Sequence, residues 1–211
     1  MKTIVLLAPS TPEYANALAF AQRIYREALS FQLTHGPELF LAIIDGDTVS
    51  GVIGLNRRIA NSLFVRDPHV QGWLASRQSR TIAEQSVLAL ERTEIGLPLL
   101  FAVLAALAET RGISEIIFAG IDVSLRTIAH LGLSVEEIAP ANQQVLRKEE
   151  QADYAKWFSL YTPIVCVVNT ADATEIAART LRRWNHRITL SRELAEMLAV
   201  PVHLDEGRDL R

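Results

Sequence analysis

Two β-prone runs separated by a very short turn constrain the fold of this chain more than any other feature of its sequence. The runs cover residues 38–44 and 48–56, and Asp45-Gly46-Asp47 lies between them. Asp-Gly between strand-forming runs is a strong hairpin signal, because glycine readily takes the backbone conformation that a tight turn needs. A turn this short makes the two strands antiparallel neighbours. We therefore expect an antiparallel ribbon early in the chain.

The rest of the chain alternates between strand-like and helix-like patterns. Thr11-Pro12-Glu13 supplies an N-cap, a proline for the first helical position and an early acid, and apolar residues then recur at helical spacing. The further predicted strands are residues 1–9, 80–90, 113–119, 133–138 and 164–168, and the predicted helices are residues 11–33, 97–111, 122–131, 172–184 and 191–198. This order predicts an α/β (α+β) fold in which a mixed sheet carries helices on its faces.

Two segments lack clean periodicity, and the chain shows no linker or repeat that would divide it. We interpret residues 57–79 as a loop packed against the core and residues 142–153 as a polar, mobile connection. A chain of 211 residues that is 49% hydrophobic has enough apolar material for one core. We expect residues 1–170 to form one domain and residues 171–211 to form a helical appendage.

Composition excludes several classes of function. The formal charge of −3 provides no strong field to attract nucleic acid or an anionic membrane. Cys166 is the single cysteine, which rules out an intrachain disulfide and a cysteine-based zinc cluster. The longest apolar stretch, residues 97–108, falls well short of the roughly 20 residues that a membrane span needs. We therefore expect a cytoplasmic protein with no membrane span.

Residues spread over about 20–170 carry a resemblance to a known family. They are Arg23, Tyr25, Gly54-Leu55-Asn56-Arg57, Ser62-Leu63-Phe64, Ser79-Arg80-Thr81-Ile82-Ala83-Glu84, Leu88-Ala89, Gly96, Phe118, Leu125-Arg126, Leu131-Gly132-Leu133, Trp157, Tyr161 and Pro163. In the spacing of these residues and the order of its predicted elements, the chain resembles the thermostable hemolysin family of the GNAT acyltransferase superfamily. That family is itself similar to acyl-homoserine-lactone synthases. The resemblance implies a GNAT-like acyl-CoA N-acyltransferase fold.

The chain departs from that family at two places. The family's strand continues from its glutamate into a glycine-asparagine-leucine-alanine run, whereas this chain reads Glu84-Gln85-Ser86-Val87-Leu88-Ala89. The family's Trp-Gly before paired tyrosines is Trp157-Phe158 here, and Tyr161 is the one tyrosine that remains. The membrane-damaging activity in the family's name has no support in this sequence, which shows neither a secretion signal nor a convincing basic amphipathic helix.

The GNAT-like fold implies a site for the donor. Its strand separates from a neighbour near Leu88, Ala89 and Leu90, where backbone groups bind a pantetheine arm. The next turn presents N–H groups to the phosphates, which assigns Arg92, Thr93, Ile95, Gly96 and Leu97 to the carrier. The alternative is a plain strand-to-helix connection in which Glu94 is favourable near the helix N-terminus.

Glu84, Arg80 and Tyr161 are the predicted catalytic residues. A carboxylate at position 84, in a largely apolar strand, is placed to accept a proton from an attacking amine. The alternative is a structural ion pair with Arg80, Arg57 or Arg23. Tyr161 or Tyr154 has a phenol that can reprotonate the leaving thiolate, a role tyrosine often holds in the superfamily. Such aromatic residues alternatively pack in a core or an interface.

Other chemistries lack their motifs. The five histidines show no metal-ligand spacing, so we expect no metal site, and Cys166 reads as a buried core residue. G-x-S-x-G, Walker A and G-x-G-x-x-G motifs do not occur. Arginines at 179, 182, 183 and 187 form a solvated face or a surface for an acidic carrier protein.

Together these features predict an acyltransferase. The donor is acyl-CoA or an acyl group on the phosphopantetheine of an acyl carrier protein, and the acceptor is a small-molecule amine. Two alternatives stay open: a catalytically inactive binding or regulatory domain of the same fold, and a subunit that forms a homodimer through its C-terminal helices.

Overall fold

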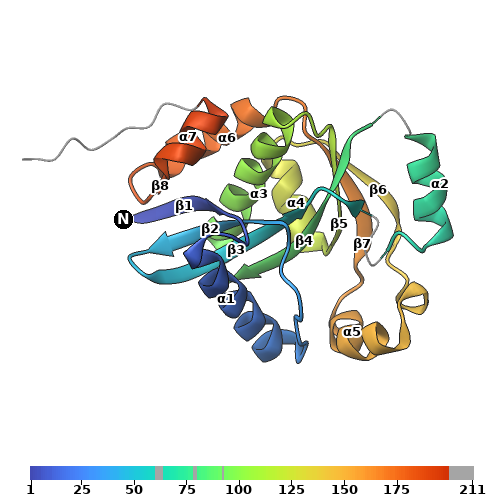
Figure 1. Ribbon diagram of the computed structural model, residues 1–211. Coiled ribbons are helices and arrows are strands. Elements are labelled where there is room, and N and C mark those ends of the chain that lie inside the picture. Colours follow the sequence, from blue (N-terminus) through green and yellow to red (C-terminus); the bar gives the residue numbers. More distant parts are fainter. Residues whose placement is uncertain (60–63, 78–79, 92, 200–211) are drawn as a thin grey trace, which may run out of the picture.

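A computed structural model describes residues 1–59, 64–77, 80–91 and 93–199, and only the backbone of residues 93–95 and 149. The strands are β1 (Lys2–Leu7), β2 (Leu39–Asp45), β3 (Thr48–Asn56), β4 (Ile82–Leu90), β5 (Glu115–Gly120), β6 (Val135–Pro140), β7 (Ile164–Asn169) and β8 (Ile188–Leu190). The helices are α1 (Pro12–Leu29), α2 (Pro68–Ser76), α3 (Thr93–Thr110), α4 (Asp122–His130), α5 (Lys148–Leu160), α6 (Ala173–Trp184) and α7 (Arg192–Leu198), with a 3₁₀ turn at Gln143–Val145. Figure 1 shows their arrangement.

The strands form one mixed sheet in the order β6-β7-β5-β4-β3-β2-β1-β8. Pairs β4/β5 and β1/β8 are parallel, and the other neighbours are antiparallel. The predicted hairpin is confirmed, because β2 and β3 pair antiparallel and end at Asp45 opposite Thr48. Gly46, at the first position of the turn, has a φ of 60°, and residues with a Cβ rarely adopt this φ. The predicted fold class is therefore correct.

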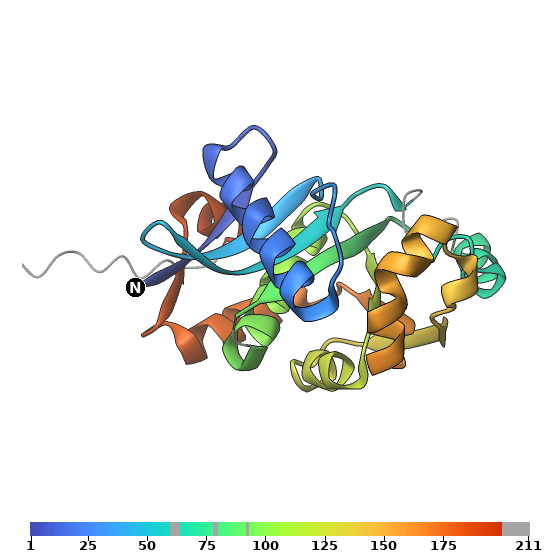
Figure 2. The ribbon, with the colours of Figure 1, turned by 90° about the horizontal axis from the view of Figure 1, so that it is seen from below.

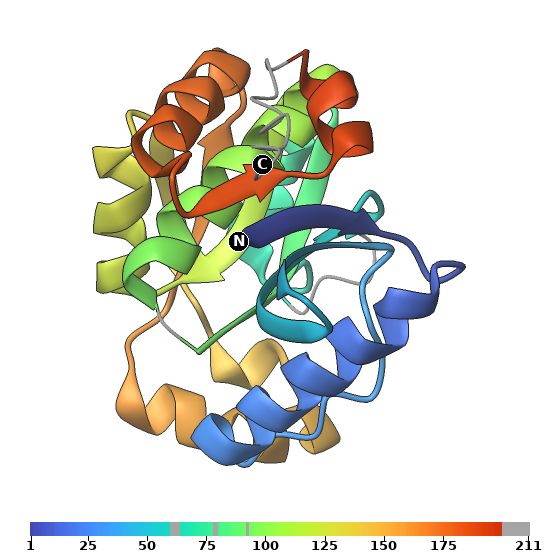
Figure 3. The same cartoon turned by 90° about the vertical axis from the view of Figure 1, so that its left-hand side faces the viewer.

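Helices cover both faces of the sheet (Figure 3). Helices α3, α4, α6 and α7 pack on one face in a single large apolar cluster. The other face holds two separate clusters: one under α1, and one formed with α2 and α5. Val87 and Ala89 of β4 belong to the α1 cluster, whereas Ile117 of β5 belongs to the α2/α5 cluster. The boundary between the two clusters therefore runs between β4 and β5.

The first strand, the strand after residue 80 and most helices lie where the sequence predicts them. Helix α1 has Thr11 as its N-cap and proline at its start, but it ends at Leu29, because Ser30 adopts a left-handed φ of 58°. The predicted extension of α1 to residue 33 is wrong. Helix α3 ends as predicted before Gly112, whose φ is 71°.

Two predicted connections contain helices. Residues 57–79 include α2, which begins at Pro68 after Asp67, and the Asp67 carboxylate accepts a 2.8 Å hydrogen bond from the His69 amide. Asp67-Pro68 is a helix-start signal. The prediction overlooked it because the residues that follow show no clear helical spacing of apolar side chains. Residues 148–153 are the first turns of α5 and not a mobile connection. The prediction of loops at these two places is wrong.

Residues 171–199 pack on the same core as the rest of the chain. Helix α6 packs along α3, β8 pairs with β1, and α7 contacts both α3 and β1. The Glu109 carboxylate of α3 accepts hydrogen bonds from the amides of Asp172 and Thr174, at 2.9 and 2.7 Å, at the start of α6. The region proposed as an appendage thus shares one apolar cluster with the sheet. Of the helices described, none has the length and hydrophobicity needed to cross a membrane.

Candidate active site

The parallel strands β4 and β5 separate partway along their length. They pair from Ile82 opposite Glu115 to Glu84 opposite Ile117. Beyond that pair, residues 85–90 of β4 and 118–120 of β5 continue without pairing with each other. Each strand stays paired with its other neighbour to its end, β5 with β7 and β4 with β3, so the sheet opens between β4 and β5. The GNAT-like resemblance implies a separation near residues 88–90, and the observed separation begins earlier, after Glu84.

A bulge in β4 accompanies the separation. Leu55 of β3 faces Gln85 and Ile53 faces Leu88, so Ser86 and Val87 together lie opposite Gly54. An extra residue bends a strand and increases its twist. A Cβ on Gly54 would lie 2.6 Å from Pro37 Cγ and 3.2 Å from Ser86 Oγ, so only glycine fits beside the bulge.

The amides of Leu88 and Leu90 face the open side of β4. The Glu91 amide donates to the Ser50 carbonyl of β3 at 3.1 Å. Strand amides alternate between the two edges, so those of residues 88 and 90 point away from β3, toward β5. The Leu88 amide donates a 3.2 Å hydrogen bond to the Tyr25 hydroxyl of α1. A side-chain oxygen therefore occupies the place of a strand carbonyl.

A row of aromatic rings covers the separation on the α1/α5 face. Tyr25 and Phe31 have ring centroids 5.6 Å apart, and Phe31 and Tyr154 lie 4.8 Å apart. Trp157 continues the row on α5, with its centroid 5.9 Å from that of Tyr154. Helices α1 and α5 lie side by side on this face, as Figure 2 shows. The row joins the two helices over the boundary between the two apolar clusters.

Glu84 lies at the closed end of the separation, on the face covered by α1 and α5. Its Oε2 accepts a 3.3 Å hydrogen bond from the Asn56 side chain. Burial raises the pKa of the Tyr154 phenol far above its usual value, and the nearby Tyr25 and Glu84 act in the same direction. Of the three arginines considered as alternative partners, Arg57 pairs with Glu38 and Arg23 pairs with Glu91, both at 3.0 Å.

The other two predicted catalytic residues, Arg80 and Tyr161, lie outside β4 and β5. Arg80 is exposed and lies in a bend two residues before β4 begins. Tyr161 caps the C-terminus of α5, is 42% exposed and comes three residues before the start of β7. Because Ile164 of β7 pairs with Gly120 of β5, Tyr161 is near the open end of the separation. Tyr154, the alternative acid, is the tyrosine beside Glu84.

Helix α3 begins earlier than the sequence predicts. It starts at Thr93, before the predicted start at residue 97, and contains Pro98, so the prediction of a turn over residues 93–96 is wrong. A Cβ on Gly96 would lie 2.8 Å from Leu90 Cδ2, so glycine lets the first helical turn approach the end of β4. The N–H groups that lack helical partners are then those of residues 93–95, while Gly96 and Leu97 are buried inside the helix. Arg92 lies outside the described residues.

The described residues contain no group of histidine, cysteine or acidic side chains that could hold a metal ion. The separation between β4 and β5 is lined instead by apolar side chains, aromatic rings and strand amides. On the α3 side, Phe101 and Phe118 contact edge to face with centroids 5.3 Å apart, and Leu88 and Leu90 pack against the same cluster. Such a setting suits an apolar group with one polar centre.

Comparisons with known proteins agree with this fold. The profile of the family described as thermostable hemolysin matches residues 7–174. Among solved structures, the CoA-dependent acyl-homoserine lactone synthase BjaI with SAM and isopentyl-CoA is similar, with a TM-score of 0.57, 13% identity, and coverage of 93% of this chain and 99% of that one. FeeM, an N-acyl amino acid synthase from uncultured soil microbes, is similar with a TM-score of 0.58 and 14% identity. The match covers 86% of this chain and 99% of FeeM. A search of curated proteins found no match.

Proposed function

This chain belongs to the thermostable hemolysin family, and from that premise and the separation of β4 and β5 we propose that it is an N-acyltransferase. It transfers an acyl group from a thioester to the amine of a small molecule. The observation that carries the proposal is that pairing between β4 and β5 stops at Glu84 and Ile117, with the Leu88 amide directed into the opening beyond. The fold shared with BjaI and FeeM supports the same reaction class.

The donor thioester occupies the opening in this proposal. Its carbonyl oxygen accepts a hydrogen bond from the Leu88 amide, which polarises the carbonyl carbon. Apolar side chains and the aromatic row enclose the reacting centre, which limits the entry of water. The backbone of Leu88, Ala89 and Leu90 aligns the pantetheine arm, because a strand edge without a partner offers regularly spaced donors and acceptors.

Glu84 is the proposed general base. The neutral amine attacks the thioester carbonyl carbon, the new N–C bond forms, and the C–S bond breaks. Through a water molecule, Glu84 takes the proton that the amine nitrogen loses. The leaving thiolate takes a proton from a phenol, and the phenolate regains one from Glu84 or water. Tyr161 at the open end and Tyr154 beside Glu84 are the candidates, and burial raises the pKa of Tyr154, which makes it a weaker acid than an ordinary phenol. Arg80 remains proposed as the third catalytic residue, to be tested together with Glu84.

Phosphates of the carrier are proposed to bind at the N-terminus of α3. The N–H groups of residues 93–95 lie in its first turn, where the helix dipole favours an anion. Arg92 adds a positive charge in this proposal. Glu91, which directly precedes Arg92 in the sequence, pairs with Arg23, and this pair offsets its repulsion of phosphate. Coenzyme A and an acyl carrier protein present the same phosphopantetheine, so either fits this end of the site.

Thermal denaturation with thioesters and a transfer assay test the proposal. Coenzyme A, acyl-CoA species of increasing chain length and an acylated carrier protein should raise the midpoint if they bind the native state. Release of free thiol in the presence of a panel of small amines then measures transfer. Binding without amine-dependent thiol release would favour the inactive binding domain. The absence of both would overturn the proposal.

A further inference from the structure

We infer that Tyr25 is a catalytic residue whose hydroxyl joins the Leu88 amide in binding the thioester carbonyl oxygen. This inference rests on the proposed function and assigns a role to a residue that the sequence analysis left without one. Tyr25 lies on α1, 63 residues before Leu88, and the two meet where β4 has left β5. The Tyr25 hydroxyl already accepts a hydrogen bond from the Leu88 amide.

The bond between Leu88 and Tyr25 leaves the phenol proton available. In it the Leu88 amide is the donor and Tyr25 Oη is the acceptor. A tyrosine hydroxyl both accepts and donates, so its own O–H is directed elsewhere. Burial raises the pKa of the Tyr25 phenol, and the Leu88 hydrogen bond opposes that shift in part. The phenol is therefore protonated at neutral pH and can act as a donor.

The geometry allows one oxygen to contact both groups. The Leu88 nitrogen and Tyr25 Oη are 3.2 Å apart. An oxygen about 2.9 Å from each of them, an ordinary hydrogen-bond distance, completes a nearly equilateral triangle. A carbonyl oxygen entering along β4 would thus replace Tyr25 as the acceptor for the Leu88 amide and at once accept the Tyr25 proton in a hydrogen bond. The two donors would converge on the atom that becomes negative as the amine adds.

The Tyr25 ring is held in place before any ligand binds. Phe31 packs against it, and Tyr154 of α5 packs against Phe31. Phe31 is 9% exposed, so this packing is away from water. A donor fixed in advance in an apolar setting stabilises developing charge without the cost of reorganising solvent. Hydrogen bonds there are also stronger than in water.

The test compares Tyr25→Phe with a matched control on the same helix. Tyr14→Phe removes another α1 hydroxyl, which donates to the backbone carbonyl of Pro37 and makes no hydrogen bond to the Leu88 amide. We expect Tyr25→Phe to lower kcat for acyl transfer about 10²- to 10³-fold, the usual loss on removing one such donor, and Tyr14→Phe to leave kcat unchanged. An unchanged kcat in Tyr25→Phe would overturn the inference.

The affinities of two unreactive acyl-CoA analogues show whether Tyr25→Phe weakens binding of the carbonyl in particular or disturbs the structure of the protein in general. One acyl-CoA analogue has CH₂ in place of the thioester sulfur and keeps the carbonyl, and a thioether analogue lacks the carbonyl. We expect Tyr25→Phe to reduce the preference for the first over the second roughly fivefold, as one lost neutral hydrogen bond implies. An unaltered preference in Tyr25→Phe overturns the role of Tyr25 alone. Failure of the wild-type protein to bind either analogue overturns the proposed function and this inference together.

A second variant covers the case in which Tyr25→Phe does not fold. Incorporation of 3-fluorotyrosine at position 25 keeps the hydroxyl and the ring packing but lowers the phenol pKa. Because the proposed donor must be protonated, we expect the alkaline limb of the kcat profile to move to lower pH. A limb that stays in place would contradict the inference.

Discussion

Glu84 of β4 and Ile117 of β5 are the last residues that pair before the two parallel strands separate. The carboxylate is therefore held at the closed end of the opening by pairing on both sides, since Glu84 also faces Asn56 of β3. The Asn56 amide donates to its Oε2, which orients the group. Glu84 and Leu88 are four positions apart on β4, so in the proposed mechanism the proton passes from the amine to Glu84 through water.

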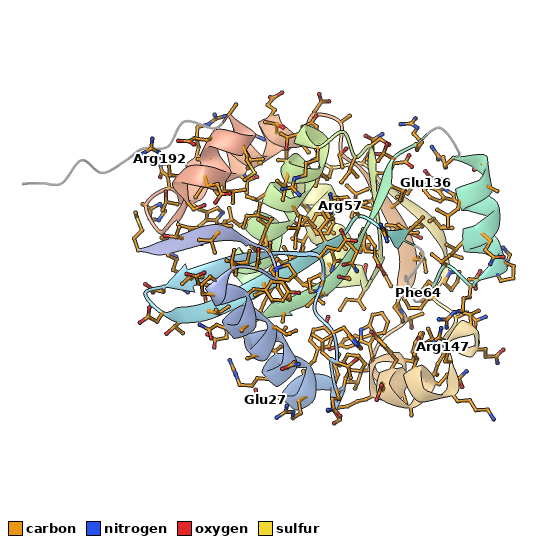
Figure 4. All side chains as sticks on the ribbon, in the orientation of Figure 1. Glu27, Arg57, Phe64, Glu136, Arg147 and Arg192 are labelled. Carbon is orange, nitrogen blue, oxygen red and sulfur yellow. The ribbon has the colours of Figure 1, made fainter. Side chains whose placement is uncertain are left out.

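We expect Glu84→Gln to lower kcat for acyl transfer by about 10²- to 10⁴-fold, because the amide keeps the shape of the side chain but cannot take a proton. Steady-state rates of thiol release measure the effect. Glu27→Gln is the control, because Glu27 lies on the exposed side of α1 and pairs with Arg23 at 3.3 Å (Figure 4). Equal rates in the wild type and Glu84→Gln would remove Glu84 from the mechanism.

A second prediction concerns Arg77, which lies between two carboxylates. Its guanidinium is 3.3 Å from Glu115 and 2.7 Å from Glu136, the latter labelled in Figure 4. Glu115 is 2% exposed, and among the described residues its Oε2 has no hydrogen-bond partner. Arg77→Ala leaves this buried carboxylate without its cation and should lower the free energy of unfolding by about 3 kcal/mol.

Urea denaturation measures the Arg77 effect, and two variants interpret it. Arg192→Ala breaks an exposed ion pair with Glu196 and should change stability little. Adding Glu115→Gln to Arg77→Ala removes the uncompensated charge and should restore part of the loss. If Arg77→Ala and Arg192→Ala have the same effect, the Arg77–Glu115 pair does not stabilise the fold.

A third prediction contrasts two glycines that have open space where a Cβ would be. Gly72 lies inside α2, whereas Gly112 follows α3 with a φ of 71°. Gly72→Ala should stabilise the protein by roughly 0.5–1 kcal/mol, because alanine restricts the unfolded chain and suits a helix. Gly112→Ala should destabilise it by about 1–2 kcal/mol, because alanine is strained at that φ. Thermal midpoints that shift in the same direction would contradict this argument.

A fourth prediction follows from Cys166 in β7. Burial raises the pKa of its thiol to about 12, and Glu137 adds to the shift. In the unfolded chain a thiol ionises near 8.5, so the stability from keeping it protonated is present below about pH 8.5 and is lost as pH rises toward 12. Cys166→Ala should therefore show a smaller decline in unfolding free energy between these values than the wild type.

Reactivity of the same thiol gives a direct measurement. A thiol-specific reagent at pH 8 should modify Cys166 slowly in the native protein and quickly in denaturant, because the thiolate is the reactive form. Rapid modification of the folded protein would show that the thiol is accessible and its pKa is not raised.

The sequence alone determined the elements whose pattern is local. The β2/β3 hairpin follows from Asp45-Gly46, the start of α1 from Thr11-Pro12, and the end of α3 from Gly112. Each depends on backbone preferences within a few residues, so neighbours in the sequence suffice to predict it. The family resemblance implied that β4 separates from a neighbour near residues 88–90, and the part of β4 that is not paired with β5, residues 85–90, includes them.

Tertiary structure decided which side chains meet. Helix α3 starts at Thr93 and has Pro98 inside it, and Gly96 allows its first turns to approach Leu90 at the end of β4. The hydrogen bond between Leu88 and Tyr25 and the pairing of Arg77 with Glu115 join residues 63 and 38 positions apart. Side-chain distances of this kind result from packing across the sheet, and no periodicity along the chain encodes them.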